Sequence, residues 1–101
     1  MTNMNQKEIY NFLTSGTMTA KISSASLRGK PHVAPVWFVV DGKSNQDVSN
    51  IIIVFTTWSK SLKARNLLLN PQVSLCIDDQ TPPYSFVIVN GIAEIDQSPD
   101  E

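Results

Sequence analysis

Apolar and polar residues change their spacing several times along this chain, and each spacing predicts a different element. Residues 5–14 place Ile9, Phe12 and Leu13 at i, i+3 and i+4, which is the spacing of one helix face. Residues 17–27 then alternate between apolar and polar side chains, which predicts a strand with one buried face. The residues expected on that face are Met18, Ala20, Ile22 and Ser24.

Four further strands are expected downstream, and all of them are rich in apolar residues. Pro35 lies in the middle of the first one and has no N–H group to donate to a sheet. It therefore indicates an edge strand, a bulge, or a strand that leaves its partner at that point. Gly91 predicts a bulge or bend in the last one. The four strands are expected at residues 32–40, 51–56, 72–77 and 84–95.

Strands joined mostly by short turns predict a mainly β fold, a small antiparallel barrel with short helices. Residues 1–101 are expected to form a single domain. A helix at residues 59–69 is inserted between the third and fourth strands, and Asn70-Pro71 ends it because proline cannot continue a helix. The strands carry more apolar residues than one barrel interior accounts for, which predicts burial against a second subunit. This surplus consists of Val36, Trp37, Phe38, Val87 and Val89.

The start of the helix at residues 59–69 carries an unusual concentration of positive charge. Lys60, Lys63 and Arg65 lie in its first turns, and the segment contains no Asp or Glu. Because a helix N-terminus already carries a partial positive charge, each exposed cation there costs about 0.3–1 kcal/mol. Free N–H groups, hydroxyls and lysines at a helix start favour a bound anion, most simply a phosphate. The alternative interpretation is the solvated face of an ordinary surface helix.

Composition narrows the classes of function. The chain has 101 residues, of which 42% are hydrophobic, and this is enough for one domain with one core. The formal net charge of −1 argues against a broad surface for nucleic acid or an anionic membrane. The lone cysteine, Cys76, excludes a disulfide framework and a Cys-based zinc site and fits a reducing compartment. No secretory signal or spanning apolar run is present, so a cytoplasmic location is expected.

Residues suited to acid–base chemistry are scarce. His32 is the only histidine, and a lone histidine at a strand start is more often a surface or packing residue than a catalytic one. Asp78 and Asp79 are expected to form a turn, and no further ligands point to a metal site beside them. The sequence therefore predicts no metal centre and identifies no catalytic residue.

Four groups of residues, taken in order, carry a resemblance to a known family. They are residues 29–39 (GKPHVAPVWFV), residues 55–57 with 63–67 and 70–71 (FTT, KARNL and NP), residues 73–79 (VSLCIDD) and residues 82–84 (PPY). This ordered set resembles the pyridoxamine 5′-phosphate oxidase-like split-barrel family, and within it the small flavin- or deazaflavin-binding branch. The resemblance covers roughly residues 8–96.

The resemblance implies a six-stranded FMN-binding split β-barrel that forms a homodimer, with the cofactor in a groove at the subunit interface. It also implies that Lys63 binds the cofactor phosphate and that the loop before Tyr84 approaches the partner's cofactor. Ser59, Lys60 and Ser61 would lie in the same phosphate-binding turn. Thr56 and Thr57 would lie beside the ring or the ribityl chain. The backbone of Pro35, Val36 and Trp37 would line the edge of the isoalloxazine ring, although packing in the core is an equally good interpretation of Trp37.

The chain departs from the family pattern at three places. The polar segment at residues 43–50 is longer than the usual hairpin, and Ser61 stands where some relatives have arginine, which predicts weaker phosphate binding. Family members usually continue with a further helix and strand, so the chain is expected to be either a member shortened at its C-terminus or a fragment. Oxidation of pyridoxamine phosphate itself is not expected, because it relies on additional basic and C-terminal residues.

These observations predict an FMN-dependent oxidoreductase that acts on a small substrate and in which the cofactor supplies the chemistry. A reductase that uses the deazaflavin F420 is the alternative; FMN ranks ahead because a shortened chain leaves less protein to hold the long F420 tail. A second alternative is a non-catalytic module that binds a flavin or another ligand. A dimer with an empty groove is the third, because a fold does not establish an activity.

Overall fold

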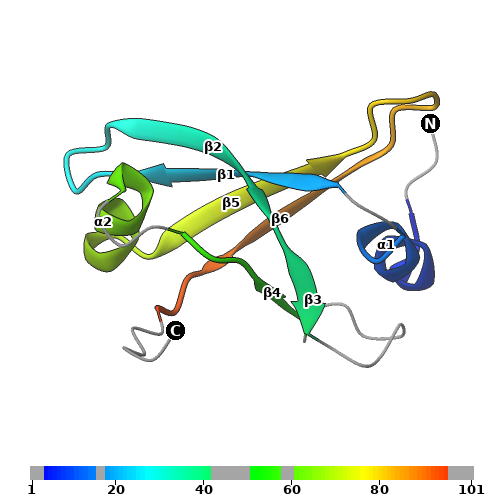
Figure 1. Ribbon diagram of the computed structural model, residues 1–101, viewed down its shortest axis with the longest axis horizontal. Helices are drawn as coiled ribbons and strands as arrows, with labels where there is room; N and C mark the ends of the chain where they lie inside the picture. Colours follow the sequence, from blue (N-terminus) through cyan, green and yellow to red (C-terminus); the bar gives the residue numbers. More distant parts are fainter. Residues whose placement is uncertain (1–3, 16–17, 42–50, 58–60, 96–101) are drawn as a thin grey trace.

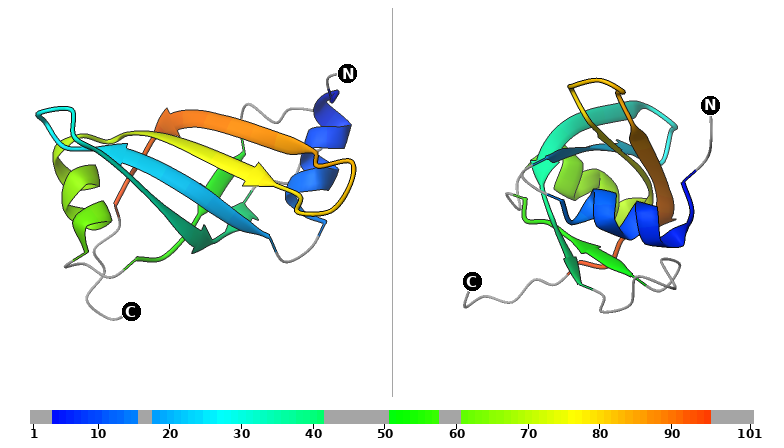
Figure 2. Two further views of the ribbon diagram at one scale, coloured as in Figure 1. Left: turned by 90° about the horizontal axis from the view of Figure 1, so that it is seen from above. Right: turned by 90° about the vertical axis from the view of Figure 1, so that its right-hand side faces the viewer.

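The computed structural model describes residues 4–15, 18–41, 51–57 and 61–95. Two short helices and six strands make up this part of the chain, and the two helices lie at opposite ends of the molecule (Figures 1 and 2). In chain order the elements are α1 (Gln6–Leu13), β1 (Thr19–Ala25), β2 (Pro31–Trp37), β3 (Val39–Asp41), β4 (Ile52–Val54), α2 (Leu62–Leu69), β5 (Gln72–Asp78) and β6 (Phe86–Ile92).

The first helix begins where the sequence places its capping residues. The side chain of Asn5 accepts a hydrogen bond from the backbone N–H of Glu8 at 2.8 Å, and the Glu8 carboxylate accepts one from the N–H of Asn5 at 3.0 Å. This reciprocal capping box satisfies donors that a helix start otherwise leaves unpaired. The second helix is capped by Ser61, described below. Neither helix is long and apolar enough to cross a membrane, within the residues that the structure describes.

The strands form two antiparallel sheets. Four strands pair in the order β2-β1-β5-β6, and β3 pairs with β4. The chain passes from the first sheet to the second at Phe38, which separates β2 from β3 (Figure 1). One continuous strand is predicted over residues 32–40, so this division corrects that prediction. The result is the mainly β split barrel with short helices that the family resemblance implies. The described residues form six strands, as the resemblance implies, rather than the five expected from the spacing pattern.

Pro35 lies on an edge strand, in agreement with the first of the three possibilities that its position allows. The pairing of β1 with β2 is unbroken, from Thr19 opposite Trp37 to Ala25 opposite Pro31. The Ser26 N–H donates to the Lys30 carbonyl at 3.0 Å and closes the hairpin. Because hydrogen-bonded and non-hydrogen-bonded pairs alternate from there, both prolines of β2 fall in non-hydrogen-bonded pairs. They therefore cost the β1–β2 ladder no hydrogen bond.

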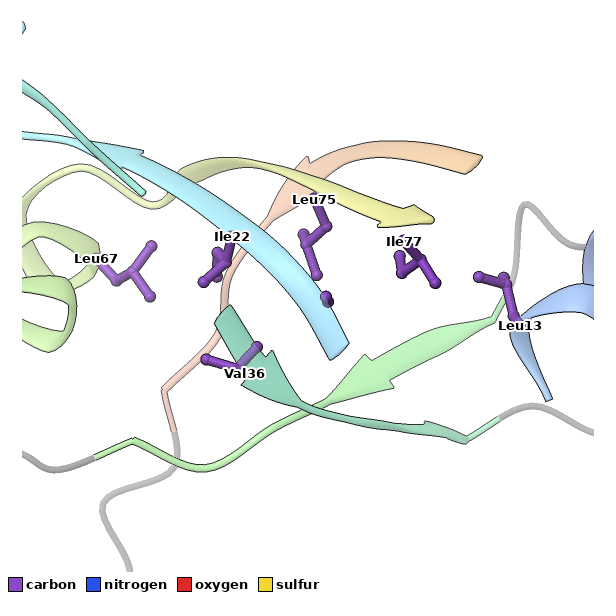
Figure 3. Packing of buried hydrophobic residues seen from close by; sticks show 7 residues of the cluster. Leu13, Ile22, Val36, Leu67, Leu75 and Ile77 are labelled. Carbon is purple, nitrogen blue, oxygen red and sulfur yellow. The ribbon is translucent and has the colours of Figure 1, made fainter. Parts of the chain in front are cut away.

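The core lies between the two sheets and is closed at each end by a helix. Figure 3 shows Leu67 of α2 at one end of the cluster and Leu13 of α1 at the other. Ile22 and Ile77, from neighbouring strands, are fully buried between them. The face expected from the alternation in residues 17–27 is confirmed, because Ala20, Ile22 and Ser24 are all buried. Phe38, Val40, Ile53 and Phe55 pack against the cluster from the second sheet and its flanks.

The prediction about surplus apolar residues is wrong for most of its members. Val36 is buried in the protein's own core, and Phe38, Val87 and Val89 pack against that core, so four of the five surplus residues lie on the inner face. Only Trp37 of that group is an exposed large hydrophobic residue. Of the two possibilities at Gly91, the bulge is excluded, because β5 and β6 stay in register from Gln72 opposite Ile92 to Asp78 opposite Phe86.

Candidate functional site

The start of α2 is organised by two hydroxyl groups. Ser61 is the N-cap residue, and its Oγ accepts a hydrogen bond from the Ala64 N–H at 3.1 Å. Thr57 Oγ1 lies 3.2 Å from the same Ser61 Oγ. The Ser61 oxygen is thus held between the helix and the segment that follows β4. Ser59 and Lys60, which are predicted to share this turn, lie outside the described residues.

This helix start is suited to an anion. A helix leaves its first N–H groups without acceptors inside the helix. The Ser61 hydroxyl accepts a hydrogen bond from the Ala64 N–H, but not from the N–H groups of Leu62 and Lys63. The first turn contains no acidic residue. Lys63 is half-buried and Arg65 is exposed, and neither forms an ion pair with a described residue. Among the described residues, cations without an ion-pair partner and N–H groups without an acceptor therefore lie together at this helix start.

A shallow hollow of about 200 Å³ is lined in part by residues that shortly precede this helix start in the sequence. It is formed where β2 passes into β3 and where β4 ends, and we call it the β3–β4 hollow. Thr56 supplies its polar end and is followed in sequence by Thr57 of the hydroxyl pair. Its lining consists of Trp37, Phe38, Val39, Val54, Phe55 and Thr56. Five of these six residues are apolar, so the hollow is suited to a flat, largely apolar ring.

The three residues predicted from β2 are placed differently from one another. Trp37 lines the β3–β4 hollow and leaves 68% of its surface exposed. Pro35 is exposed on the opposite side of the sheet from the core, in register with Lys21. Val36 is 7% exposed and belongs to the core. Of the predicted site residues, the structure therefore brings together Trp37 and Thr56 in the hollow and Thr57, Ser61 and Lys63 at the helix start.

A second hollow of about 280 Å³ is lined in part by Asp79 and Gln80, from the loop before Tyr84 that the resemblance places near the partner's cofactor. We call it the Asp79 hollow. Its lining includes Trp37, Lys21, Asp78, Asp79 and Gln80, so Trp37 is common to both hollows. Lys21 Nζ and Asp78 Oδ1 form an ion pair at 2.7 Å across β1 and β5. Lys21 is the only charged residue of β1 and is the sequence signal that points to this place.

The family model described as pyridoxamine 5′-phosphate oxidase matches residues 6–101 of this chain. This chain belongs to the pyridoxamine 5′-phosphate oxidase family. The match includes every residue of both hollows and of the helix start. The family that the resemblance indicates is thereby confirmed.

A solved structure of an F420 reductase resembles this member of the pyridoxamine 5′-phosphate oxidase family. The two share 27% sequence identity with a TM-score of 0.69 over 84% of this chain. The chain covers 61% of the length of that reductase. A search of curated proteins finds no significant match. Together the two matches support an oxidoreductase family that uses a flavin or deazaflavin cofactor.

The described residues fit such a cofactor in two respects. The β3–β4 hollow supplies an apolar surface for a ring, and the acid-free start of α2 supplies donors for a phosphate. Thr56 and Thr57 connect the two along the chain.

Proposed function

We propose that this domain binds a flavin or deazaflavin cofactor and acts as an oxidoreductase on a small substrate. One observation carries the proposal: the apolar β3–β4 hollow leads along Thr56 and Thr57 to a hydroxyl-capped helix start that has no acidic residue. Apolar ring, polar chain and phosphate follow one another in the same order in a flavin mononucleotide. The family membership of the chain supports this interpretation.

The protein's own groups would bind and orient the cofactor. Lys63 and the free N–H groups of the first turn would bind the phosphate, and the Thr57 and Ser61 hydroxyls would add hydrogen bonds. Trp37 and Phe55 would pack against the ring in the β3–β4 hollow and exclude water from one side of it. The bound flavin or deazaflavin supplies the redox chemistry, which explains why the chain can act with so few acid–base residues.

The choice between FMN and F420 depends on an observation outside the anion site, because both cofactors carry a phosphate on a ribityl-type chain. The sequence analysis ranks FMN first. The likeness to an F420 reductase, at 27% identity over 84% of the chain, favours the deazaflavin. We therefore propose F420 as the first cofactor to test and FMN as the second.

We also propose that the protein acts as a homodimer that buries the outer face of the four-stranded sheet. The registers place a set of large apolar side chains on this face, away from the core, and each leaves more than half of its surface exposed. An apolar surface of this kind is typical of an interface with another protein. The residues are Val33, Trp37, Phe86, Ile88 and Ile92.

The test of the cofactor proposal is a titration of cofactor-free protein with F420, FMN and riboflavin, in which binding is monitored by the fluorescence of the ligand. Riboflavin has the ring and ribityl chain of FMN without its phosphate, so it measures the contribution of the anion site. We expect F420 or FMN to bind at least tenfold more tightly than riboflavin. Binding of neither phosphate-bearing cofactor would overturn the proposal. Tight binding without substrate reduction under any electron donor would support the non-catalytic module instead.

A further inference from the structure

The solvent-facing side of α2 is apolar toward the end of the helix. Leu68 and Leu69, in its last turn, leave 53% and 64% of their surfaces exposed, whereas Ala64 and Leu67 are buried on its inner side. A surface helix normally presents charged or polar side chains to the solvent. An outward apolar face of this kind indicates contact with something other than water.

The turn between β1 and β2 lies beside this end of the helix. The last pair of β1 with β5 is Ser23 opposite Ser74. Continued toward the turn, this register brings Leu27 to the level of Asn70, the C-cap residue of α2. The helix contacts both β1 and β2, and two views show it side by side with the turn (Figures 1 and 2). The turn adds a third exposed leucine, because Leu27 leaves 71% of its surface accessible.

Three cations accompany these leucines. Arg28 and Lys30 lie in the turn, and Arg65 lies one helical turn before Leu69 on the same side of α2. All three are exposed, and none forms an ion pair with a described residue. We call this surface the hairpin–α2 patch. It consists of Leu27, Arg28, Lys30, Arg65, Leu68 and Leu69.

Most of the described acidic residues lie away from this patch. Neither the β1–β2 hairpin nor α2 contains an Asp or Glu. Glu8 of α1 and Asp78, the last residue of β5, belong to the opposite end of the molecule (Figure 1). Glu94 lies nearer, because the N–H of its neighbour Ala93 donates to the Pro71 carbonyl at 2.8 Å. Positive charge is therefore concentrated at one end, although the net charge of the whole chain is −1.

The patch is separate from the surfaces that the proposed function uses. It contains none of the residues of the outer sheet face assigned to the dimer, and none of its residues lines either hollow. Its leucines lie at the C-terminal end of α2, whereas the phosphate is proposed at the N-terminal end, beside Ser61 and Lys63. The cofactor and dimer proposals therefore assign these six residues no role.

The composition of the patch favours a lipid surface over a folded protein as its partner. Protein interfaces concentrate their binding energy in tryptophan, tyrosine and arginine side chains that fill pockets, and leucine is under-represented among them. The patch contains no aromatic residue and no hollow. Leucines flanked by Arg and Lys are instead typical of segments that lie on anionic membranes, because the apolar side chains enter the boundary of the acyl chains while the cations stay at the headgroups.

We propose that the hairpin–α2 patch docks this protein on the surface of an anionic phospholipid bilayer. The three leucines enter the headgroup boundary, and Arg28, Lys30 and Arg65 contact the lipid phosphates. The net charge of the chain argues against a broad basic surface, and this one is confined to one end of the molecule. Docking does not depend on the cofactor, so it goes beyond the proposed function.

The experiment measures sedimentation of the full chain with two kinds of vesicle. One is neutral phosphatidylcholine, and in the other about one third of the lipid is anionic phosphatidylglycerol. We expect the wild-type protein to bind the anionic vesicles at least about tenfold more tightly, and added salt to weaken that binding. Equal affinity for the two vesicles, or binding to neither at low salt, would overturn the proposal. Self-association that Leu69→Ser abolishes, without vesicle binding, would assign the patch to a second copy of the chain instead.

Two double variants test the residues of the patch. Arg28→Gln combined with Arg65→Gln should lower the affinity for anionic vesicles at least about tenfold, because each cation near such a surface contributes about fivefold. Leu27→Ser combined with Leu69→Ser leaves the charge unchanged and should lower the affinity at least about fivefold. Unchanged affinity in either double variant would contradict the proposal. In particular, a loss in the arginine variant alone would leave a charge attraction without insertion.

Matched controls come from exposed residues outside the patch. Lys7→Gln, on α1, removes a cation, and Ile52→Ser, on β4, removes an apolar side chain that is 59% exposed. Both should bind the vesicles as the wild type does, and an equal loss in either would overturn the assignment to the patch. The comparison of the two vesicles with the wild-type protein holds even if a variant fails to fold. None of these results would affect the cofactor titration, which tests the proposed function separately.

Discussion

Ser24 in β1 and His32 in β2 lie opposite each other, and neither Ser24 Oγ nor His32 Nδ1 has a hydrogen-bond partner among the described residues. Ser24 is 3% exposed, so its hydroxyl is withdrawn from solvent. A buried polar group without a partner costs about 1–3 kcal/mol. The pair lies at the end of the core near α2, where Asn66 is also buried.

Replacement of Ser24 with alanine should therefore not destabilise the protein. We expect Ser24→Ala to leave the free energy of unfolding unchanged or to raise it by up to about 1 kcal/mol, because the variant removes an unsatisfied hydroxyl. Urea denaturation followed by circular dichroism measures the difference. Ser23→Ala, on the opposite face of the same strand, is the control. A loss of more than about 1 kcal/mol in Ser24→Ala alone would show that the hydroxyl has a partner.

Lys63 is expected to contribute to cofactor affinity through the phosphate group alone. We expect Lys63→Ala to weaken FMN or F420 binding roughly tenfold or more, because it removes a charge-assisted hydrogen bond. Riboflavin, which has no phosphate, should bind the variant and the wild type equally well. Fluorescence titration of each ligand checks this expectation. Lys7→Ala, an exposed lysine of α1 at the other end of the molecule, should behave like the wild type. An equal loss for riboflavin would assign Lys63 a structural role instead.

A variant of Ser61 separates capping from cofactor binding. Aspartate is as good an N-cap as serine and places a negative charge at the positive end of the helix dipole, so Ser61→Asp should unfold at the same or a higher urea concentration. The same charge lies where the phosphate is expected, and FMN or F420 affinity should fall at least tenfold. Ser61→Ala should instead lose about 1 kcal/mol of stability. If Ser61→Asp bound either cofactor as tightly as the wild type, the phosphate would lie elsewhere.

The proposed dimer can be tested at Ile88. This residue lies on the outer face of β6 and is 52% exposed in the single chain, so a lysine there should change the stability of the monomer little. We expect Ile88→Lys to convert a dimer to a monomer in light scattering coupled to gel filtration, because it would bury an unpaired charge at the interface. Leu68→Lys is the control, since Leu68 is 53% exposed on α2. A wild-type protein that runs as a monomer would itself contradict the proposal.

Local patterns in the sequence predict the elements well. The helix expected at residues 59–69 is observed as Leu62–Leu69 within the described residues, and the strand expected at residues 72–77 is observed as Gln72–Asp78. Helix and strand spacing, caps and breakers act over a few residues, so they can be recognised without the fold. The acid-free helix start is recognised for the same reason.

Long-range pairing explains what the sequence does not predict. The four residues at positions 86–89 are all apolar, so their pattern does not indicate that Val87 and Val89 face the core while Phe86 and Ile88 face outward. Lys21 and Asp78, the ion pair of the Asp79 hollow, are separated by 57 positions and meet only through the β1–β5 pairing. Spacing along the chain carries no information about such a contact.

The two prolines of β2 have a consequence for how this sheet can grow. Because Pro31 and Pro35 fall in non-hydrogen-bonded pairs with β1, the nitrogen of each is directed to the open side of the edge strand, where it has no hydrogen to offer. An incoming strand would find two donors missing within five residues. Native proteins use such gaps to prevent strand addition and the aggregation that follows from it. Polymerisation by addition of strands from other molecules is therefore prevented along β2. In this sheet it would have to begin at β6, the other edge strand.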